Sequence, residues 1–272
     1  MIRDITIGQY YPAKSVLHSL DPRVKFTGTI LFLISLFVAD SVWGYLLATV
    51  FLAAIILLSK VPVKFMMKGL KPLFFIFLVT ISFNLFLVPG TVIAQFWIFK
   101  ITEEGIKQAV KIGIRLIYLV MGSSVMTLTT TPNQLTDGLE KLMHPLTRIR
   151  VPVHEISMMM SIALRFIPIL MEETDKIMKA QIARGADFES GNIINKAKNL
   201  IPLLVPLFIS AFRRADDLAM AMEARCYHGG EHRTSMKPLK YKGIDRIAYG
   251  MLFAYLAAGT VIGVLLRGGG RR

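Results

Sequence analysis

Long apolar runs dominate this 272-residue chain and restrict what it can fold into. Residues 24–39 read VKFTGTILFLISLFVA, and residues 42–59 read VWGYLLATVFLAAIILLS. Each run is close to the roughly 20 apolar residues that an α-helix needs to cross a bilayer. Similar runs occupy residues 72–88, 105–128 and 244–266. The sequence therefore predicts an all-α integral membrane protein with about five transmembrane helices and long helices outside the membrane.

The composition supports a membrane protein, with 54% hydrophobic residues and a mean hydropathy of +0.54. A formal charge of +14 suits either nucleic acid or an anionic lipid surface. The apolar runs favour lipid, so we expect membrane lipid as a partner and no nucleic acid. Cys226 is the only cysteine, which excludes an internal disulfide. No apolar segment or cleavage site precedes Val24, so we expect no cleaved signal peptide.

The chain divides into three regions by its charge pattern. Residues 1–128 contain four expected spans and a basic link at 60–71, KVPVKFMMKGLK, which has four lysines and no acid. Such a link suits the inner leaflet, so we expect it and the amino terminus to be cytoplasmic in a multi-pass cell-membrane protein. Residues 129–243 mix acids and bases and predict cytoplasmic or interfacial helices. Residues 244–272 form the last span and a tail, whose arginines leave the side of the carboxyl terminus open.

Two shorter apolar blocks lie within the charged region, at residues 156–171 and 200–212. Both fall short of a full span and are interrupted by Arg165, Pro168, Pro202 and Pro206. We interpret each block as the membrane-buried half of a longer helix with a charged half in the cytoplasm. The two blocks are expected to cross each other at the membrane boundary.

Charged side chains also fall inside the fourth expected span, where Lys107, Lys111 and Arg115 share a helix face near its outer end. One interpretation is pairing with Glu103 and Glu104 together with extension of the side chains toward the membrane surface. The other is a substrate path, because ionisable groups in a membrane often serve function. The sequence leaves both open.

No catalytic motif occurs in the chain, which has no phosphate loop, no H-E-x-x-H and no G-x-S-x-G. We therefore predict that the chain is not an enzyme and that another subunit must bind any ATP used. His228 and His232 stand four residues apart beside Cys226 and Glu231, but two glycines between them would break a helix. A loop is the preferred interpretation over a metal site, and no metal is expected.

One sequence ending occurs twice, as DKIMKAQIARGAD at 175–187 and DDLAMAMEARCYH at 216–228. The two align without a gap and share the pattern D-x-[IL]-x-x-A-x-x-A-R. Arginine in a last helical turn can simply complement the helix dipole, with Gly185 as a left-handed cap. The duplication instead favours two docking tips, because a small alanine allows close approach and the guanidinium fork suits carboxylates or carbonyls of a partner.

Methionines line the first apolar block, at Met158, Met159, Met160 and Met171. Two interpretations explain them equally well. One is ordinary core packing. The other is a deformable surface whose flexible thioethers accept different partners.

These features together resemble the transmembrane T component of energy-coupling factor transporters, which take up vitamins and transition-metal ions. The resemblance covers nearly the whole chain and includes SLDPRVKF at 19–26 and the basic link. Its specific part is the motif pair Ala183-Arg184-Gly185 and Ala224-Arg225-Cys226. The second motif has Cys226 where glycine is commoner, which puts the geometry of its cap in question.

The resemblance implies a function and a set of partners. Arg184 and Arg225 would dock into two ATP-hydrolysing subunits, which bind ATP and magnesium, so this chain would hold no cofactor of its own. The helices with the methionine cluster would carry a membrane-embedded substrate-capture subunit, the S component. The predicted function is to transmit ATP-driven motion from the ATPases to that subunit. The alternatives are a self-sufficient secondary transporter, with Asn84 as its main candidate residue, and a membrane-embedded enzyme.

Overall fold

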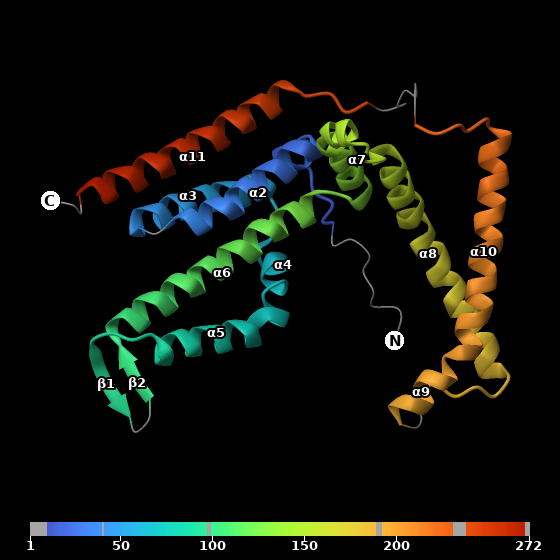
Figure 1. The fold of residues 1–272 in the computed structure, drawn as a ribbon, viewed down its shortest axis with the longest axis horizontal. Helices are drawn as coiled ribbons and strands as arrows, with labels where there is room; N and C mark the ends of the chain where they lie inside the picture. The colour runs from blue at the N-terminus through green and yellow to red at the C-terminus, as the bar shows by residue number, and fades with distance from the viewer. Residues whose placement is uncertain (1–9, 40, 97–98, 189–191, 231–237, 270–272) are drawn as a thin grey trace. The chain divides into compact units, whose positions relative to one another are not determined.

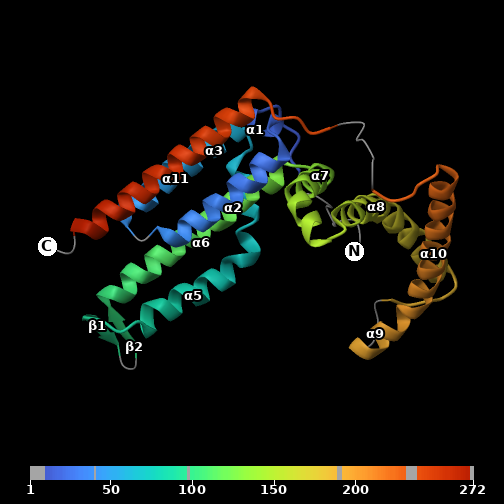
Figure 2. The ribbon, with the colours of Figure 1, turned by 45° about the horizontal axis from the view of Figure 1, so that its top comes forward.

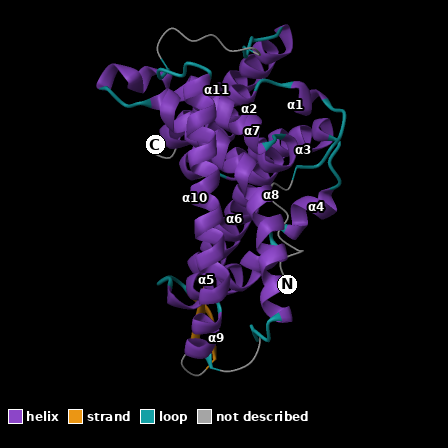
Figure 3. Ribbon diagram, turned by 90° about the vertical axis from the view of Figure 1, so that its right-hand side faces the viewer, coloured by secondary structure: helices purple, strands orange, loops and turns teal. Residues whose placement is uncertain are grey.

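The computed structural model describes residues 10–39, 41–96, 99–188, 192–230 and 238–269. The chain forms two compact units. One contains Gly8–Gly138 and Leu239–Arg272 and is called the bundle unit here. The other contains Leu139–Pro238 and is called the crossing unit. Figure 3 shows that helices make up nearly all of the described chain, as the sequence predicted.

The bundle unit contains mostly helices and one small hairpin. Its elements are α1 (Val16–Ser19), α2 (Pro22–Val38), α3 (Val42–Ser59), α4 (Val63–Lys68), η2 (Lys71–Leu73), α5 (Phe74–Leu87), β1 (Val92–Phe96), β2 (Phe99–Thr102), α6 (Glu103–Thr129) and α11 (Gly243–Gly269). Helix α7 (Pro132–Met143) contains the boundary between the two units. The elements of the crossing unit are η3 (His144–Ile149), α8 (Val153–Ala183), α9 (Ile193–Asn199) and α10 (Ile201–Ala224).

Short polar side chains define where the bundle helices begin. The Asp21 carboxylate accepts a hydrogen bond from the Arg23 backbone N–H at 2.9 Å, with Pro22 as the first residue of α2. Ser41 accepts from the Gly44 N–H at 3.1 Å at the start of α3. Thr102 does the same for Gly105 at 3.0 Å at the start of α6. Each cap satisfies a backbone N–H that the helix itself leaves unpaired.

Helices α2, α3, α6 and α11 lie side by side in the bundle unit (Figures 1 and 2). Their core contains Phe32, Leu36, Ala48, Leu52 and Tyr255. Phe51 of α3 stacks on Tyr255 of α11, with ring centroids 4.2 Å apart. The Tyr255 hydroxyl meets the Ser35 hydroxyl at 2.7 Å, so this polar group is paired inside the apolar core.

Among the described residues, five helical stretches are long and apolar enough to cross a membrane, which agrees with the predicted number. They are Val42–Ser59, Val63–Leu87, Glu103–Thr129, Val153–Ala183 and Gly243–Val264. Helix α2, expected to be the first span, has 17 residues, one fewer than the shortest of these stretches. Helix α8 is among them because the block 156–171, expected to be too short to span, belongs to a helix of 31 residues. The stretch Val63–Leu87 includes part of the basic link as well as the third expected span.

A hairpin that the sequence did not predict precedes α6, between the third and fourth expected spans. Strands β1 and β2 pair antiparallel, with Val92 opposite Thr102 and Phe96 opposite Phe99. The segments VIAQF and FKIT are rich in β-branched and aromatic residues, which favour strands.

Candidate functional site

Helices α8 and α10 of the crossing unit pack against each other and cross (Figures 1 and 2). The Glu173 carboxylate of α8 accepts hydrogen bonds from the Ser210 hydroxyl at 2.5 Å and from Arg214 Nη2 at 2.5 Å. Gln181 Nε2, two turns further along α8, donates to the Pro202 carbonyl of α10 at 3.2 Å. The contacts advance along α8 while they recede along α10, so the two helices run in opposite senses. These polar contacts use the charged half of α8 and not the block 156–171.

The first repeated ending closes α8 and is called the first tip, Ala183–Gly185. Arg184 caps the helix, and Gly185 takes a left-handed conformation with φ +88°. The Gly185 N–H donates to the Ile182 carbonyl at 2.9 Å, and the Ala186 N–H donates to the Gln181 carbonyl at 3.0 Å. This pair of bonds is a Schellman motif, which satisfies the last carbonyls of a helix.

The second ending closes α10 with the same geometry and is called the second tip, Ala224–Cys226. Arg225 caps the helix, and Cys226 is left-handed with φ +55°. The Cys226 N–H donates to the Glu223 carbonyl at 2.8 Å, and the Tyr227 N–H donates to the Met222 carbonyl at 3.0 Å. Cysteine in place of glycine therefore leaves the cap geometry unchanged. All three residues of each tip are exposed.

The two tips lie at opposite ends of the crossing helices. The Gln181–Pro202 bond places the end of α8 beside the beginning of α10, whereas the second tip follows the end of α10. A helix of 24 residues is roughly 35 Å long, so the two arginines are separated by a comparable distance. One small groove could not receive both arginines, but two separate sockets could.

The predicted methionine surface is only partly exposed. Met159 and Met160 are 57% and 41% exposed, whereas Met158 and Met171 are half-buried. Large apolar side chains of α10 are also exposed, at Val205, Phe208, Ile209 and Phe212. The crossing unit therefore presents uncovered apolar side chains on both of its long helices.

Residues near the second tip do not form a metal site in the described part of the chain, where no group of three potential metal ligands occurs. His228 Nδ1 meets the Cys226 carbonyl at 2.9 Å. Glu231 and His232, the other members of the weighed metal site, lie outside the described residues. The His154 ring instead contacts Glu140 through Nδ1 at 3.1 Å.

The charged groups of α6 have local partners. Lys107 pairs with Glu103 at 2.6 Å, and Arg115 Nε donates to the Tyr45 hydroxyl at 3.1 Å. Lys111 also has an interaction partner. Asn84 Nδ2 donates to the Thr80 carbonyl of its own helix at 2.8 Å. These contacts favour the pairing interpretation over a substrate path.

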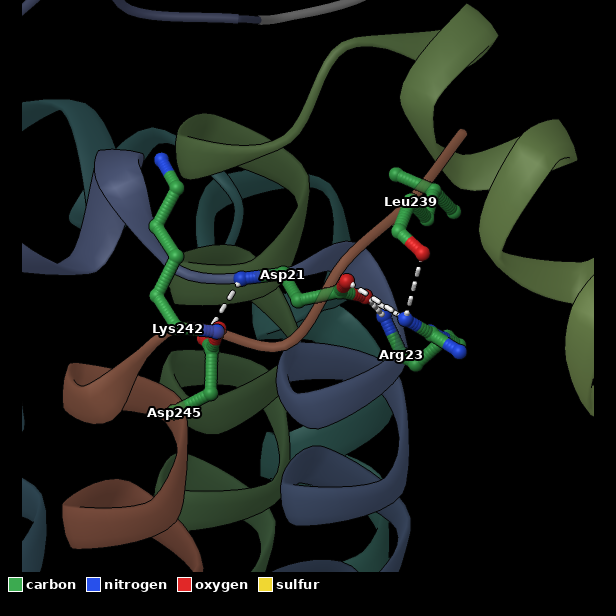
Figure 4. Close-up of polar contacts among 5 residues, drawn as sticks. All are labelled: Asp21, Arg23, Leu239, Lys242 and Asp245. Carbon is green, nitrogen blue, oxygen red and sulfur yellow. Dashed lines mark hydrogen bonds and ion pairs between the residues drawn. The ribbon is translucent and has the colours of Figure 1, made fainter. Parts of the chain in front are cut away.

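A polar cluster at one end of the bundle unit was not found from the sequence (Figure 4). The Asp21 N–H donates to Asp245 Oδ1 at 2.8 Å, and the Lys242 N–H donates to Asp245 Oδ2 at 2.7 Å. Arg23 binds the Asp21 carboxylate through Nε at 3.0 Å and Nη2 at 2.9 Å. The same Nη2 reaches the Leu239 carbonyl at 3.4 Å. We call this cluster the clamp, because it joins the start of α2 to the start of α11.

The clamp shifts the ionisation of Asp21. Burial of this carboxyl disfavours its charged form, but hydrogen bonds from the Arg23 side chain and backbone, with the charges of Arg23 and Lys25, outweigh burial and lower its pKa. The Asp-Pro step at 21–22 is a sequence signal for the start of a helix. No local signal points from it to Asp245.

Comparison with known proteins identifies relatives along nearly the whole chain. Residues 13–236 match the family CbiQ, described as cobalt transport protein. A protein of Ruminiclostridium cellulolyticum, named energy-coupling factor transporter transmembrane protein EcfT, is 55% identical over 94% of this chain and 96% of its own length. Proteins with the same name from Thermosediminibacter oceani and Bacillus subtilis are 54% and 48% identical, over 96% and 90% of this chain and 98% and 93% of their own lengths.

Proposed function

The chain belongs to the CbiQ family and is a transmembrane component of an energy-coupling factor transporter, and on that premise we propose that it couples two ATPase subunits to a substrate-capture subunit. It is a transporter component and not itself an enzyme. In the proposed arrangement the ATPases bind ATP and magnesium, and their motion reaches the capture subunit through α8 and α10. The cargo would be a vitamin or a related micronutrient.

The observation that carries this proposal is the duplicated tip. Two helices end with the same Ala-Arg pair, the same left-handed residue and the same two backbone bonds. Such rigid caps limit the freedom of the exposed arginines before binding, so less conformational entropy is lost on docking. Their separation along α10 suits two ATPases, one for each tip.

The crossing contact supports transmission of motion between the tips. Glu173, Ser210 and Arg214 connect α8 to α10 between the two ends, and Gln181 adds a second connection near the first tip. Movement of one tip would therefore change the position of the other helix. The exposed apolar side chains of Met159, Met160 and α10 offer the surface for the capture subunit. In the proposed topology the amino terminus and residues 129–243 are cytoplasmic.

The test is charge reversal at the tips, by Arg184→Glu and Arg225→Glu separately and together. Loss of a charge-assisted contact in a partly desolvated socket costs about 2 to 5 kcal/mol, so each change should weaken ATPase binding by more than about tenfold. Copurification of the ATPases and uptake by reconstituted complexes are the measurements. Membrane insertion and binding of the capture subunit should stay normal, because the tips are exposed ends of helices.

Matched controls are Lys198→Glu and Lys198→Ala, which alter an exposed lysine of α9 that belongs to neither tip. A solvated lysine of this kind should contribute well under about 1 kcal/mol. Normal copurification and normal uptake by the double arginine variant would reject the coupling role. The tips would then be helix caps and nothing more.

A further inference from the structure

An apolar groove of about 500 Å³ lies within the bundle unit. Its walls come from α3 and α11, and its floor comes from α2 and α6. Several small residues line it: Gly28 and Gly122 on the floor, and Ala54, Ala254 and Ala258 on the walls. Its volume falls within the range of about 300 to 1,000 Å³ that is typical of ligand sites.

The mouth of this groove reaches the surface of the unit. Val50 of α3 is 61% exposed and Met251 of α11 is 52% exposed, and both line the groove. Helices α3 and α11 both contain candidate membrane spans, so hydrocarbon and not water would face the mouth. The groove has the shape and polarity to accept an acyl chain from the surrounding bilayer.

A second hollow of about 620 Å³ adjoins the apolar groove. The two share Leu58 at the end of α3, and α1 contributes to both, with Leu17 in the groove and Val16, His18 and Ser19 in the hollow. The hollow is also lined by Lys14, Ser15 and Lys60, and no acidic residue lines it among the described residues. A shallow hollow that contains two lysines therefore lies beside the apolar groove, with Leu58 at the border of both.

The two lysines project from fixed backbone positions. Lys60 caps α3 in a left-handed conformation with φ +54°, and the buried Ser59 hydroxyl accepts from the Val61 N–H at 3.2 Å. Lys14 directly precedes Ser15, which caps α1 and contacts His18 Nδ1 at 2.7 Å. Both lysine side chains are exposed. They can therefore meet a negatively charged group without large rearrangement of the backbone.

Lys25 has a different role at the inner end of the groove. Its ammonium donates to the Thr129 carbonyl at 2.9 Å and to the His18 carbonyl at 3.3 Å, at the ends of α6 and α1. These bonds hold the elements that close the groove. The charge available to a bound molecule is therefore that of Lys14 and Lys60.

We propose that this pair of cavities binds one anionic phospholipid, with its headgroup phosphate at Lys14 and Lys60 and one acyl chain in the groove between α3 and α11. A negative headgroup complements two lysines in a hollow without acids, and the hydrocarbon chain fills a space that no described side chain occupies. The lipid would support the packing of α11 against α3 at this end of the bundle. This assignment is independent of the coupling function.

Native mass spectrometry of the full-length chain in detergent tests the headgroup site, with phosphatidylglycerol and phosphatidylcholine of identical acyl chains as probes. The wild-type chain should retain one phosphatidylglycerol in preference to phosphatidylcholine. The double variant Lys14→Gln with Lys60→Asn should weaken the binding of phosphatidylglycerol about thirty-fold, and each single change should weaken it about fivefold. Asparagine suits position 60 because it tolerates the left-handed conformation. The matched control is Lys64→Gln with Lys71→Gln, which removes the same charge from exposed residues outside both cavities.

A second pair of variants tests the acyl-chain groove. Ala54→Phe fills the groove from an exposed wall position, whereas Ala53→Phe adds the same ring to an exposed neighbour that does not line it. Ala54→Phe should reduce retention of both lipids at least tenfold, and Ala53→Phe should not. Equal retention of the two lipids by the wild type would overturn the proposal. The proposal would also be overturned if the double lysine variant retained as much lipid as Lys64→Gln with Lys71→Gln. The same holds if Ala54→Phe retained as much as Ala53→Phe.

Discussion

The backbone N–H of Asp21 donates a hydrogen bond to the Asp245 carboxylate at 2.8 Å, although the two residues are 224 positions apart. Asp245 is 1% exposed and also accepts from the Lys242 N–H. One side chain thus begins α11 and holds the cap of α2 (Figure 4). The first and last long helices of the bundle unit depend on each other through this carboxylate.

Asp245→Ala should destabilise the bundle unit. It leaves the buried Asp21 N–H and the partly exposed Lys242 N–H without their acceptor. An unsatisfied buried donor costs about 1 to 3 kcal/mol, and the Lys242 N–H, which can bond to water, adds less. We expect a total loss of about 1 to 4 kcal/mol in the free energy of unfolding, measured by denaturant titration in detergent. Arg246→Ala, at an exposed neighbour, is the control. An Asp245→Ala protein as stable as this control would show that the clamp does not stabilise the bundle.

Stability should also depend on the charge of Asp21. Its folded-state pKa is lowered, so the unfolded chain binds this proton more readily than the folded chain does. The stabilising contribution is therefore present above the ordinary aspartate pKa of about 3.9 and is lost as the pH falls through and below it. Thermal unfolding between pH 7 and pH 3 measures this loss.

Asp21→Asn supplies the comparison for the pH series, because asparagine still caps a helix but carries no charge. The variant should be less stable at pH 7 and should lose less stability on acidification than the wild type. Asp217→Asn removes an exposed carboxyl of α10 and should leave the profile unchanged. Parallel profiles for wild type and Asp21→Asn would contradict the assigned role of the carboxylate.

Introducing glycine at the second tip and removing glycine from the first tip should have opposite effects on stability. A left-handed conformation costs a residue other than glycine about 1 to 2 kcal/mol. Glycine avoids this cost, but its greater conformational freedom in the unfolded chain offsets part of the advantage. Cys226→Gly should therefore stabilise the end of α10 by about 0.5 to 1 kcal/mol. Gly185→Ala should destabilise the end of α8 by a similar amount, although no atom lies near enough to clash with the added methyl group.

Amide hydrogen exchange in the last turn of each helix measures both effects, because local opening is reported there. Copurification of the ATPases should persist in Cys226→Gly, since the arginine and its backbone bonds remain. Slower exchange in Gly185→Ala, or faster exchange in Cys226→Gly, would contradict the expected conformational cost.

Replacement of Met158, Met159 and Met160 by isoleucine should weaken the binding of some capture subunits more than that of others. Isoleucine is branched at Cβ and restricts the side-chain rotamers, which removes the adaptability of the thioethers. Affinities for several capture subunits, measured side by side, give the result. Met143→Ile, outside α8, is the control. Unchanged affinities for every capture subunit would mean that these side chains only pack locally.

Local sequence signals predicted much of the helical structure. The apolar run at 42–59 coincides with α3, and the run at 105–128 lies within α6. The repeated ending predicted two arginine-bearing sites, and the structure places each at the end of a long helix with the same cap. These features follow from hydrogen bonds between residues a few positions apart. The docking role of the arginines stays a prediction.

Other features could not be read from local patterns. The hairpin before α6 was missed because its strands are short and follow an apolar helix directly. The length of α8 as a candidate span was not predicted, because its charged half continues the apolar half without a break. Charge and proline within a helix lower its mean hydropathy, but they do not end it.

The sequence by itself determined that the chain lies in a membrane, that its fold is all-α, and that two helices end in an Ala-Arg pair. The length of an apolar run and a repeated Ala-Arg pair are local properties of the chain. Only the tertiary structure decided that Asp245 holds Asp21, that Glu173 joins α8 to α10, and that a groove lies beside Lys14 and Lys60. Each of these depends on side chains from segments far apart in the chain. Their meeting is set by the packing of whole helices, and no periodicity within one segment encodes it.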